Sequence, residues 1–174
     1  MSRIVKIILC LSVGSAAFAQ APQPGPEMKK LEAFNGTWVG KMKHYMEPGA
    51  APQVTDGTLV FDMIMGGMYQ RMTYTSEMPG MGKIDGLILT GYDAQKKCYR
   101  SWNYNNFIPV PVEETSNWEG ESIVGKSVPM DMGMGPMVQH STVRLKGKDE
   151  MVIKIDGEMG GQRFTMLEIE LKRK

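Results

Sequence analysis

The 174-residue chain has the length of one ordinary domain and is too short for two comfortable ones. Its 20 Lys and Arg residues nearly balance 19 Asp and Glu, and this formal charge of +1 argues against nucleic-acid partners and polybasic membrane contacts. Two cysteines exclude a disulfide-stapled mini-protein, and two histidines leave little material for a histidine-rich metal site. The 17 methionines outnumber the 5 Phe, 6 Tyr and 3 Trp combined.

Residues 1–19 are predicted to be a secretory signal peptide. Arg3 and Lys6 give a positive start, and a short apolar stretch precedes the small-x-small pattern of residues 17–19. The apolar run is too short and too interrupted for a spanning helix, so we predict a periplasmic or secreted protein without stable membrane insertion after cleavage. Cleavage leaves Cys98 as the only thiol, and its strand-like surroundings favour a buried role.

Residues 20–34 are predicted to form a proline-rich tether followed by a short helix over 27–34. Met28, Leu31 and Phe34 lie three residues apart, which places them on one helical stripe behind a proline start.

Residues 35–174 are predicted to form one antiparallel all-β domain. Turn signals such as Asn35-Gly36 and Asp156-Gly157 recur mostly about every 8–14 residues, and no later segment sustains a helical period. This pattern favours a barrel or a two-sheet sandwich, and closing the sheet into a barrel of about 8–10 strands also removes exposed edges. The predicted strands are 37–46, 57–65, 68–76, 84–91, 97–104, 115–120, 122–128, 137–146, 150–156 and 162–172.

A resemblance to known proteins rests on landmarks of the first hundred residues. Gly36-Thr37-Trp38 opens the first strand as Gly-x-Trp does in lipocalin-type barrels. Further landmarks are Pro48-Gly49, Gly57-Thr58, Gly66-Gly67, Met78-Pro79-Gly80-Met81, Gly91-Tyr92-Asp93, Lys97, Tyr99 and Trp102. With them the chain resembles exported bacterial proteins grouped as a domain of unknown function, DUF1579. The resemblance implies an antiparallel lipocalin-like (calycin-type) barrel and export, and it assigns no catalytic residue. The chain differs at Met68 and Tyr69, where that family usually carries an arginine and an aromatic residue.

The first functional hypothesis is a non-enzymatic binding protein that holds a small hydrophobic or amphipathic molecule in the barrel. Inward-facing aromatic and methionine side chains would line a cavity, which such a ligand requires to be about 300 Å³ or more. Asn103, Asn105 and Asn106, near the expected barrel mouth, either orient a polar head group or form turns. The predicted lining residues are Trp38, Met63, Met65, Tyr92 and Trp102, and a one-residue error in strand register would invert this choice.

The alternative hypothesis is a methionine-rich Cu(I)-binding envelope protein, with copper as its cofactor; the first hypothesis needs no cofactor. Thioether sulfur is a soft ligand suited to Cu(I). For most of the methionines, simple filling of the core is the competing interpretation. The two candidate sets are Met130, Met132, Met134 and His140, and Met42, His44 and Met46.

Enzymatic function has no motif in its favour. The sequence contains no Gly-x-Ser-x-Gly elbow, His-Glu-x-x-His pair or phosphate-binding loop. Glu113 and Glu114 are adjacent, but neighbours on an extended chain point to opposite faces and make a poor acid–base couple. We therefore expect a protein that is not an enzyme, and a filled structural barrel without a ligand is the third hypothesis.

Overall fold

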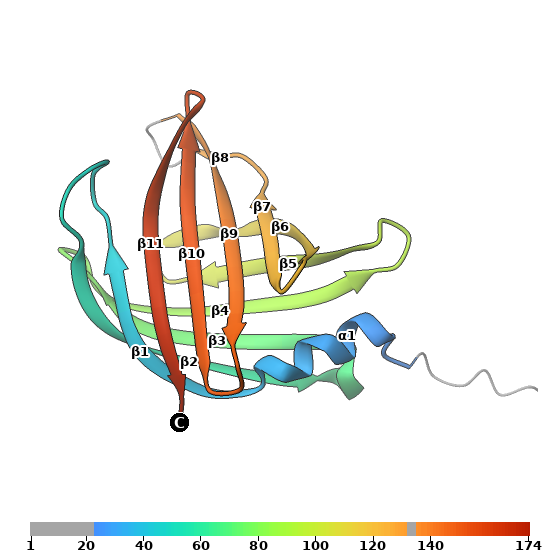
Figure 1. The fold of residues 1–174 in the computed structure, drawn as a ribbon. Helices are drawn as coiled ribbons and strands as arrows, with labels where there is room; N and C mark the ends of the chain where they lie inside the picture. The colour runs from blue at the N-terminus through green and yellow to red at the C-terminus, as the bar shows by residue number, and fades with distance from the viewer. Residues whose placement is uncertain (1–22, 132–134) are drawn as a thin grey trace, which may run out of the picture.

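A computed structural model describes residues 23–131 and 135–174, which form an antiparallel barrel with a short helix at one end (Figure 1). The sheet order is β10-β11-β1-β2-β3-β4-β5-β6-β7-β9-β8, and the pairing of β9 with β10 closes ten strands into the barrel. This confirms the predicted fold class. The strands are β1 (Gly36–His44), β2 (Gln53–Ile64), β3 (Tyr69–Met78), β4 (Gly82–Asp93), β5 (Cys98–Asn105), β6 (Ile108–Glu119), β7 (Ser122–Ser127), β8 (Met130–Asp131), β9 (Pro136–Lys146), β10 (Glu150–Met159) and β11 (Gln162–Arg173).

The helix consists of two short pieces. It begins as α1 (Pro26–Leu31) and continues into a 3-10 turn (Glu32–Phe34), within the predicted range of 27–34. Pro26 suits the first helical position because the N–H it lacks would have no partner there. The apolar side chains of the predicted stripe are all buried in the core: Met28, Leu31 and Phe34.

Side chains from three strands bind the backbone of this helix, so that it closes one end of the barrel. Carbonyl groups at the C-terminal end of a helix, here those of Leu31 and Phe34, have no partner within it, and the Glu27 carbonyl in the first turn gains an additional donor. Here the donors come from the inner faces of β1, β3 and β5. The hydrogen bonds run from Trp38 Nε1 to the Phe34 carbonyl (2.7 Å), from Gln70 Nε2 to the Leu31 carbonyl (2.7 Å) and from the Tyr99 hydroxyl to the Glu27 carbonyl (2.9 Å).

Strand β6 begins much earlier than predicted, and β2 begins at Gln53 rather than at residue 57. β6 starts at Ile108 rather than at residue 115, and Pro109 and Pro111 lie inside it. A proline lacks the N–H that a ladder on both sides needs. The register of β6 with β7 begins only at Glu114, so the two prolines lie where β6 pairs with β5 alone. The short strand β8 was not predicted.

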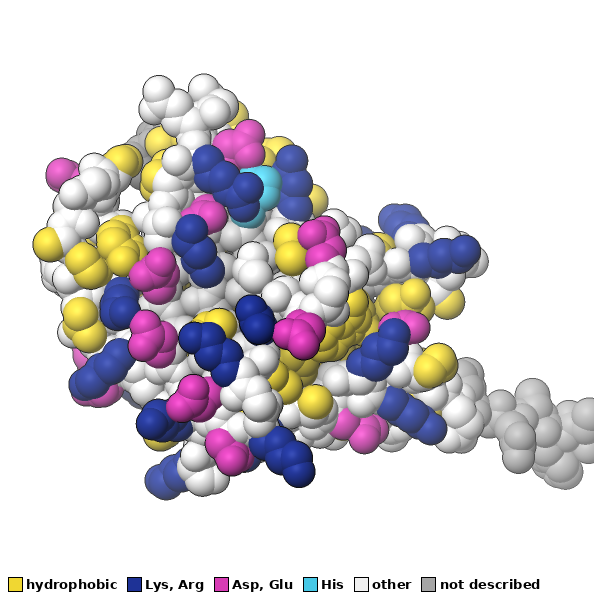
Figure 2. Space-filling model, in the orientation of Figure 1, with side chains coloured by type: hydrophobic (Ala, Val, Ile, Leu, Met, Phe, Trp, Pro, Cys, Tyr) yellow, Lys and Arg dark blue, Asp and Glu magenta, His cyan; other side chains and the backbone are white. Residues whose placement is uncertain are grey.

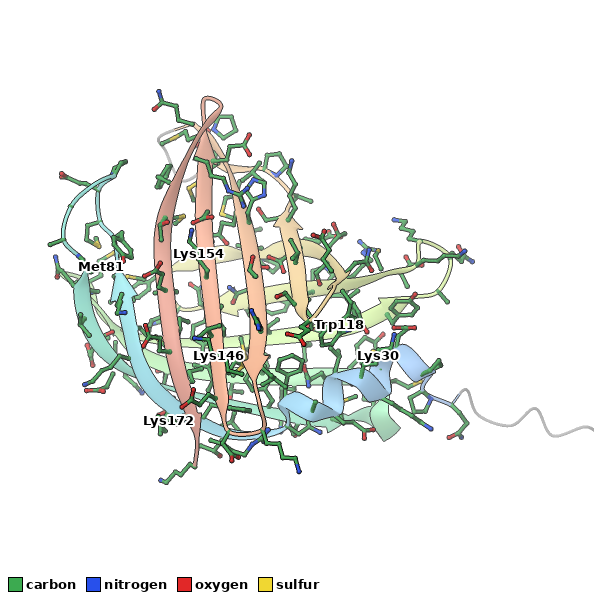
Figure 3. The ribbon with its side chains drawn as sticks, viewed as in Figure 1. Lys30, Met81, Trp118, Lys146, Lys154 and Lys172 are labelled. Carbon is green, nitrogen blue, oxygen red and sulfur yellow. The ribbon has the colours of Figure 1, made fainter. Side chains whose placement is uncertain are left out.

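The inner face of each strand follows from the buried core and the register. Trp38 and Tyr99 are almost completely buried, side chains alternate along a strand, and directly paired residues share a face. On the opposite face, Lys146, Lys154 and Lys172 are exposed on the outside of β9, β10 and β11 (Figure 3). The single thiol of this part of the chain, Cys98, is buried as predicted.

Candidate functional site inside the barrel

One inner wall of the barrel, formed by β5, β6, β7 and β9, carries a group of polar side chains among its apolar ones. Because Tyr99 faces the core, Ser101 and Asn103 share the inner face of β5. The registers of β5 with β6, β6 with β7 and β7 with β9 place further polar residues on the same face. We call these residues the polar wall: Ser101, Asn103, Glu114, Ser116, Ser127 and Ser141.

The opposite inner wall, formed by β10, β11, β1 and β2, is apolar. Met42 lies across from Ile169, and Ile155 lies across from Leu167. These side chains pack in or against the hydrophobic core. We call this set the apolar wall: Met42, Leu59, Ile153, Ile155, Leu167 and Ile169. A molecule inside the barrel therefore meets hydroxyl, amide and carboxyl groups on one side and aliphatic or thioether groups on the other.

Glu114 is the acidic residue of the polar wall and is mostly buried. The Ser141 hydroxyl donates to Glu114 Oε1 at 2.9 Å. A Cβ atom at Gly125 would clash with this carboxyl group and with the Ser141 hydroxyl, so the glycine provides the space that both occupy. Burial raises the pKa of Glu114, and the Ser141 hydrogen bond opposes this to a smaller extent. The neighbouring Glu113 points outward and forms an ion pair with Arg100, as alternation along the strand predicts.

Polar groups also line the barrel end away from the helix. His44 Nε2 lies 2.9 Å from Thr55 Oγ1, which in turn lies 3.1 Å from Ser76 Oγ. Burial lowers the pKa of His44 and so favours its neutral imidazole. This end therefore offers hydrogen-bonding groups, none of which requires a permanent charge.

The three asparagines predicted near the mouth have different roles. Asn103 faces the interior, and its Oδ1 accepts a hydrogen bond of 2.9 Å from the Tyr74 hydroxyl. Asn105 Oδ1 accepts the two N–H groups of the following turn, and Asn106 Nδ2 donates to the Lys83 carbonyl. Asn103 and Asn105 therefore lie beside Tyr74 in the interior, whereas Asn106 serves the turn.

Buried and partly exposed side chains both occur along the whole inner face, since His44, Ser127 and Met137, far from the helix, are also buried. Around α1, large side chains such as Trp38 and Met151 have no exposed surface. In Figure 2, apolar side chains are visible in a hollow between α1 and the β6–β7 turn, where Figure 3 places Trp118. Solvent therefore reaches part of the inner surface. Inner-face residues that keep some exposure include Met63, Tyr92, Trp118, Ile123, Val143 and Leu145 near the helix and Met72, Tyr74, Ile88, Ser101, Asn103, Glu114, Gln139, Ser141, Ile155 and Leu167 farther along the barrel.

Three of the five predicted lining residues lie on the inner face. Trp38 is completely buried, and the Arg173 guanidinium lies 4.1 Å from the centroid of the indole ring. Trp38 therefore closes the helix end of the barrel. Tyr92 packs edge-on against Tyr99 with ring centroids 5.2 Å apart. Met63 is half-buried against the core. All three therefore belong to the helix end.

The other two predicted lining residues, Met65 and Trp102, lie away from the inner face, and the structure corrects their placement. Met65 lies in the 3-10 turn after β2 (Met65–Gly67), is 73% exposed and has a φ of 50°. Trp102 lies on the outer face of β5, where the Arg100 guanidinium is 5.1 Å from its ring centroid. Because Tyr99 takes the inner position, Trp102 has to point outward.

The first candidate copper set is only partly brought together. Met42 and His44 share the inner face of β1, as predicted. Met42 packs in the core, where a Cβ at Gly57 would clash with its thioether. Met46 lies beyond the end of β1 and is exposed, so it does not join them.

The second candidate copper set is divided between the two faces of β9. Met130 pairs with Met137 on the inner face, whereas His140 lies on the outer face with its Nε2 2.7 Å from Glu158 Oε2. The register instead places Met159 beside Met137, which gives an inner row of Met130, Met137 and Met159. Met132 and Met134 lie outside the described residues. Within 23–131 and 135–174, no three His, Cys, Asp or Glu side chains form a cluster suited to a metal ion.

Two hollows in the described surface open on the outside of the barrel. One of about 500 Å³ is lined by residues that include Lys41, Asp56 and Lys172, and one of about 300 Å³ by residues that include Lys126 and His140. None of the predicted lining residues contributes to either. Neither hollow lies inside the barrel, so neither supplies the interior cavity of about 300 Å³ that the first hypothesis requires.

Sequence reasoning missed Glu114 and Ser141 as interior residues. From the sequence, Glu113 and Glu114 were interpreted only as a possible catalytic pair. The available signal was the alternation Val112, Glu114, Ser116, Trp118, which places the second glutamate in phase with apolar residues.

A comparison with protein families identifies the chain. Residues 23–173 match a family described as "Protein of unknown function (DUF1579)". The chain belongs to the DUF1579 family. The match covers the helix and every strand of the barrel, which confirms the resemblance inferred from the landmark residues. No curated protein matches the DUF1579 chain.

Solved structures share the barrel of this DUF1579 protein at low sequence identity. The crystal structure of Rv2717c from M. tuberculosis is 15% identical with a TM-score of 0.64, over 87% of this chain and 99% of that one. The S-type phycobiliprotein lyase CPES from Guillardia theta is 11% identical with a TM-score of 0.53, over 84% and 90%. Such likeness shows the fold alone. In the described part of the chain, no helix has the length and hydropathy needed to span a bilayer.

Proposed function

We propose that this DUF1579 protein is a non-enzymatic binding protein that holds one small hydrophobic or amphipathic molecule inside its barrel. The observation that carries the proposal is the division of the interior into the polar wall and the apolar wall. Pockets for small molecules are typically apolar with a few placed polar groups, and this interior has that composition. The partial exposure of Ile155, Leu167 and Glu114 supports access from solvent.

The proposal includes a periplasmic or secreted location. It rests on the predicted signal peptide at residues 1–19, which lies outside the described residues. The mass of the protein recovered from its native envelope provides the test. A mature chain beginning at Gln20 supports export, and an intact Met1 terminus in the cytoplasmic fraction contradicts it.

Native mass spectrometry of the protein purified from its own envelope, without added metal, tests the binding function. We expect an adduct of one small organic molecule that is released on denaturation. Ile155→Trp fills the space beside the apolar wall and should abolish the adduct, whereas Val152→Trp on the outer face of β10 should retain it. A bare mass for the unaltered protein would favour a filled structural barrel instead.

The inner row of Met130, Met137 and Met159 supports a second candidate function, Cu(I) binding. Directly paired residues on neighbouring strands bring their side chains within contact distance, and three thioethers form a soft ligand set. Competition with a chromophoric Cu(I) chelator tests it. The double variant Met137→Leu, Met159→Leu should lose binding that the exposed control Met81→Leu retains, and equal affinity in both would exclude this row.

A further inference from the structure

The charge inside the barrel is unusual because it consists of one carboxyl group without a basic partner. Among the described strands, the lysines and arginines lie on the outer face, with one exception at the helix end. That exception is Arg173, whose guanidinium stacks on Trp38 and donates to the carbonyls of Ala33, Asn35 and Lys148. Arg173 is therefore committed to closing the barrel.

The position of Glu114 is fixed by its surroundings. Its carboxyl group lies over Gly125, accepts a hydrogen bond from Ser141, and has Ser101 and Ser127 as its direct cross-strand neighbours. These neighbours are small and uncharged, and their hydroxyl groups add acceptors around the carboxyl group. No described residue forms an ion pair with Glu114. Glu114 is therefore a fixed acceptor whose charge no described cation neutralises.

The sign of the preferred ligand charge follows from this arrangement. Burial already disfavours the ionised carboxyl group, as the raised pKa of Glu114 reflects. A cation placed next to it offsets that cost, while an anion entering the same space would find repulsion and no counter-charge. The apolar wall opposite accommodates an aliphatic or aromatic body.

We propose that the barrel binds amphipathic amines, with the ammonium group donating to the Glu114 carboxylate and the apolar part lying against the apolar wall. This inference rests on the proposed binding function and adds the chemical class of the ligand. Ser101 and the Asn103 side-chain oxygen complete the acceptors of the polar wall. Fatty acids and other anionic amphiphiles are disfavoured by the same geometry.

Calorimetric titration with three twelve-carbon compounds tests the proposal: dodecylamine, dodecan-1-ol and sodium dodecanoate, each below its critical micelle concentration. We expect the amine to bind most tightly and the carboxylate most weakly. Glu114→Gln should weaken amine binding by about 10- to 100-fold, the range expected for a charged hydrogen bond, and leave dodecan-1-ol nearly unchanged. Glu113→Gln is the matched control, since it removes a carboxylate from the adjacent residue on the outer face.

The outcomes separate the two levels of the argument. If the alcohol binds and Ile155→Trp blocks it, but the amine gains nothing and Glu114→Gln has no effect, the amine proposal is overturned and the binding function stands. If none of the three compounds binds, the proposed function itself fails. Equal weakening by Glu113→Gln would show that the amine responds to surface charge and would also overturn the proposal.

The pH dependence of amine binding gives an independent readout. Acid protonates Glu114 and removes the attraction, so affinity should fall between pH 7 and pH 4.5 in the unaltered protein and stay flat in Glu114→Gln. The residues that face Glu114 from β5, β7 and β9 are Ser101, Ser127, Gly125 and Ser141, none of which titrates in this range. His44 on β1 faces the same interior, and its protonation would also repel the amine, so Glu114→Gln is needed to separate the two groups. An unchanged slope in that variant would assign the effect to His44 and contradict the proposal.

Discussion

The helix end of the barrel and the half beyond it are built from the same ten strands but are filled differently. At the helix end, large side chains are completely buried, and their polar atoms bind the helix backbone. In the other half, small polar residues face an apolar wall and several inner side chains keep some exposure. Hydrogen-bonded strands close the barrel along its whole length, while the largest fully buried side chains, such as Trp38, Tyr99 and Phe34, gather at the helix end.

The difference indicates where stability and binding capacity lie. Burying a large apolar side chain contributes about 1.5–3 kcal/mol, whereas a buried carboxyl group such as Glu114 has a desolvation cost. The helix end, where the largest side chains are fully buried, thus contributes much of the stability of the fold. Residues that bind a ligand commonly have this cost in the unliganded protein.

Replacing Trp38 with alanine should have the largest effect on the fold. The change leaves a cavity at the helix end, removes the hydrogen bond to the Phe34 carbonyl and leaves Arg173 without its aromatic partner. We expect a loss of about 3–5 kcal/mol in the free energy of unfolding, measured by urea denaturation. A loss comparable to that of Ile155→Ala in the other half would contradict the contrast between the two ends.

Replacing Tyr99 with phenylalanine should have an intermediate effect. Its hydroxyl donates to the Glu27 carbonyl and accepts a hydrogen bond of 3.2 Å from Trp118 Nε1, and burial raises the pKa of Tyr99 to about 12. Because the variant keeps the ring and leaves buried groups without a partner, we expect a loss of about 1–2 kcal/mol. Hydrogen exchange should localise the loss to α1. Tyr74→Phe, which removes the bond to Asn103 in the other half, serves as the comparison.

Glu114→Gln should increase the stability of the folded protein at neutral pH. The pKa of Glu114 in the folded protein lies above its ordinary value, so the folded state binds the carboxyl proton more tightly than the unfolded state does. The stability that this proton contributes is present at low pH and is lost as pH rises through the folded-state pKa. Glutamine avoids that loss, so the variant should be more stable than the unaltered protein at pH 7, with the difference shrinking toward pH 4. Thermal unfolding at both pH values measures this, and a constant difference would refute it.

His44→Gln should give the smallest effect, visible only on acidification. The folded-state pKa of His44 lies below its ordinary 6.5, so stability is lost as pH falls through 6.5 toward the folded value. The glutamine variant should lack that part of the acid loss and match the unaltered protein above pH 7. The slope of melting temperature against pH, compared between the two proteins, decides the question.

Most of the architecture could be predicted from the sequence because turns and apolar spacing are local signals. The stripe of Met28, Leu31 and Phe34 and most strand positions were correct on that basis. The choice of which β5 side chains face inward was wrong, because Cys98 and Tyr99 are both buried and the usual alternation of apolar and polar residues is missing there. Trp102 was consequently assigned to the wrong face. Met65 failed for another reason, because the chain leaves β2 at Ile64 and turns before Gly66.

The interior site was harder to predict because it depends on pairing between distant strands. Ser141 reaches Glu114 only through the closure of β7 on β9, and nothing local to either residue indicates that contact. The methionine row has the same origin, since Met159 enters it through the pairing of β10 with β9. The residue types indicated which side chains could bind a ligand, but the strand register determines which of those side chains lie next to one another.

The pairing of β1 with β11 has a consequence for how the chain folds. The first strand of the barrel is hydrogen-bonded to the last, and Arg173 is bound to carbonyl groups about 140 residues earlier in the chain. Contacts between residues so far apart in sequence form slowly, because the chain loses conformational entropy in closing the loop before the contacts can contribute any stability. Until residues 162–173 emerge, β1 has a free edge open to other strands. Barrel closure therefore requires residues 162–173, and the edge of β1 stays unpaired until they are available.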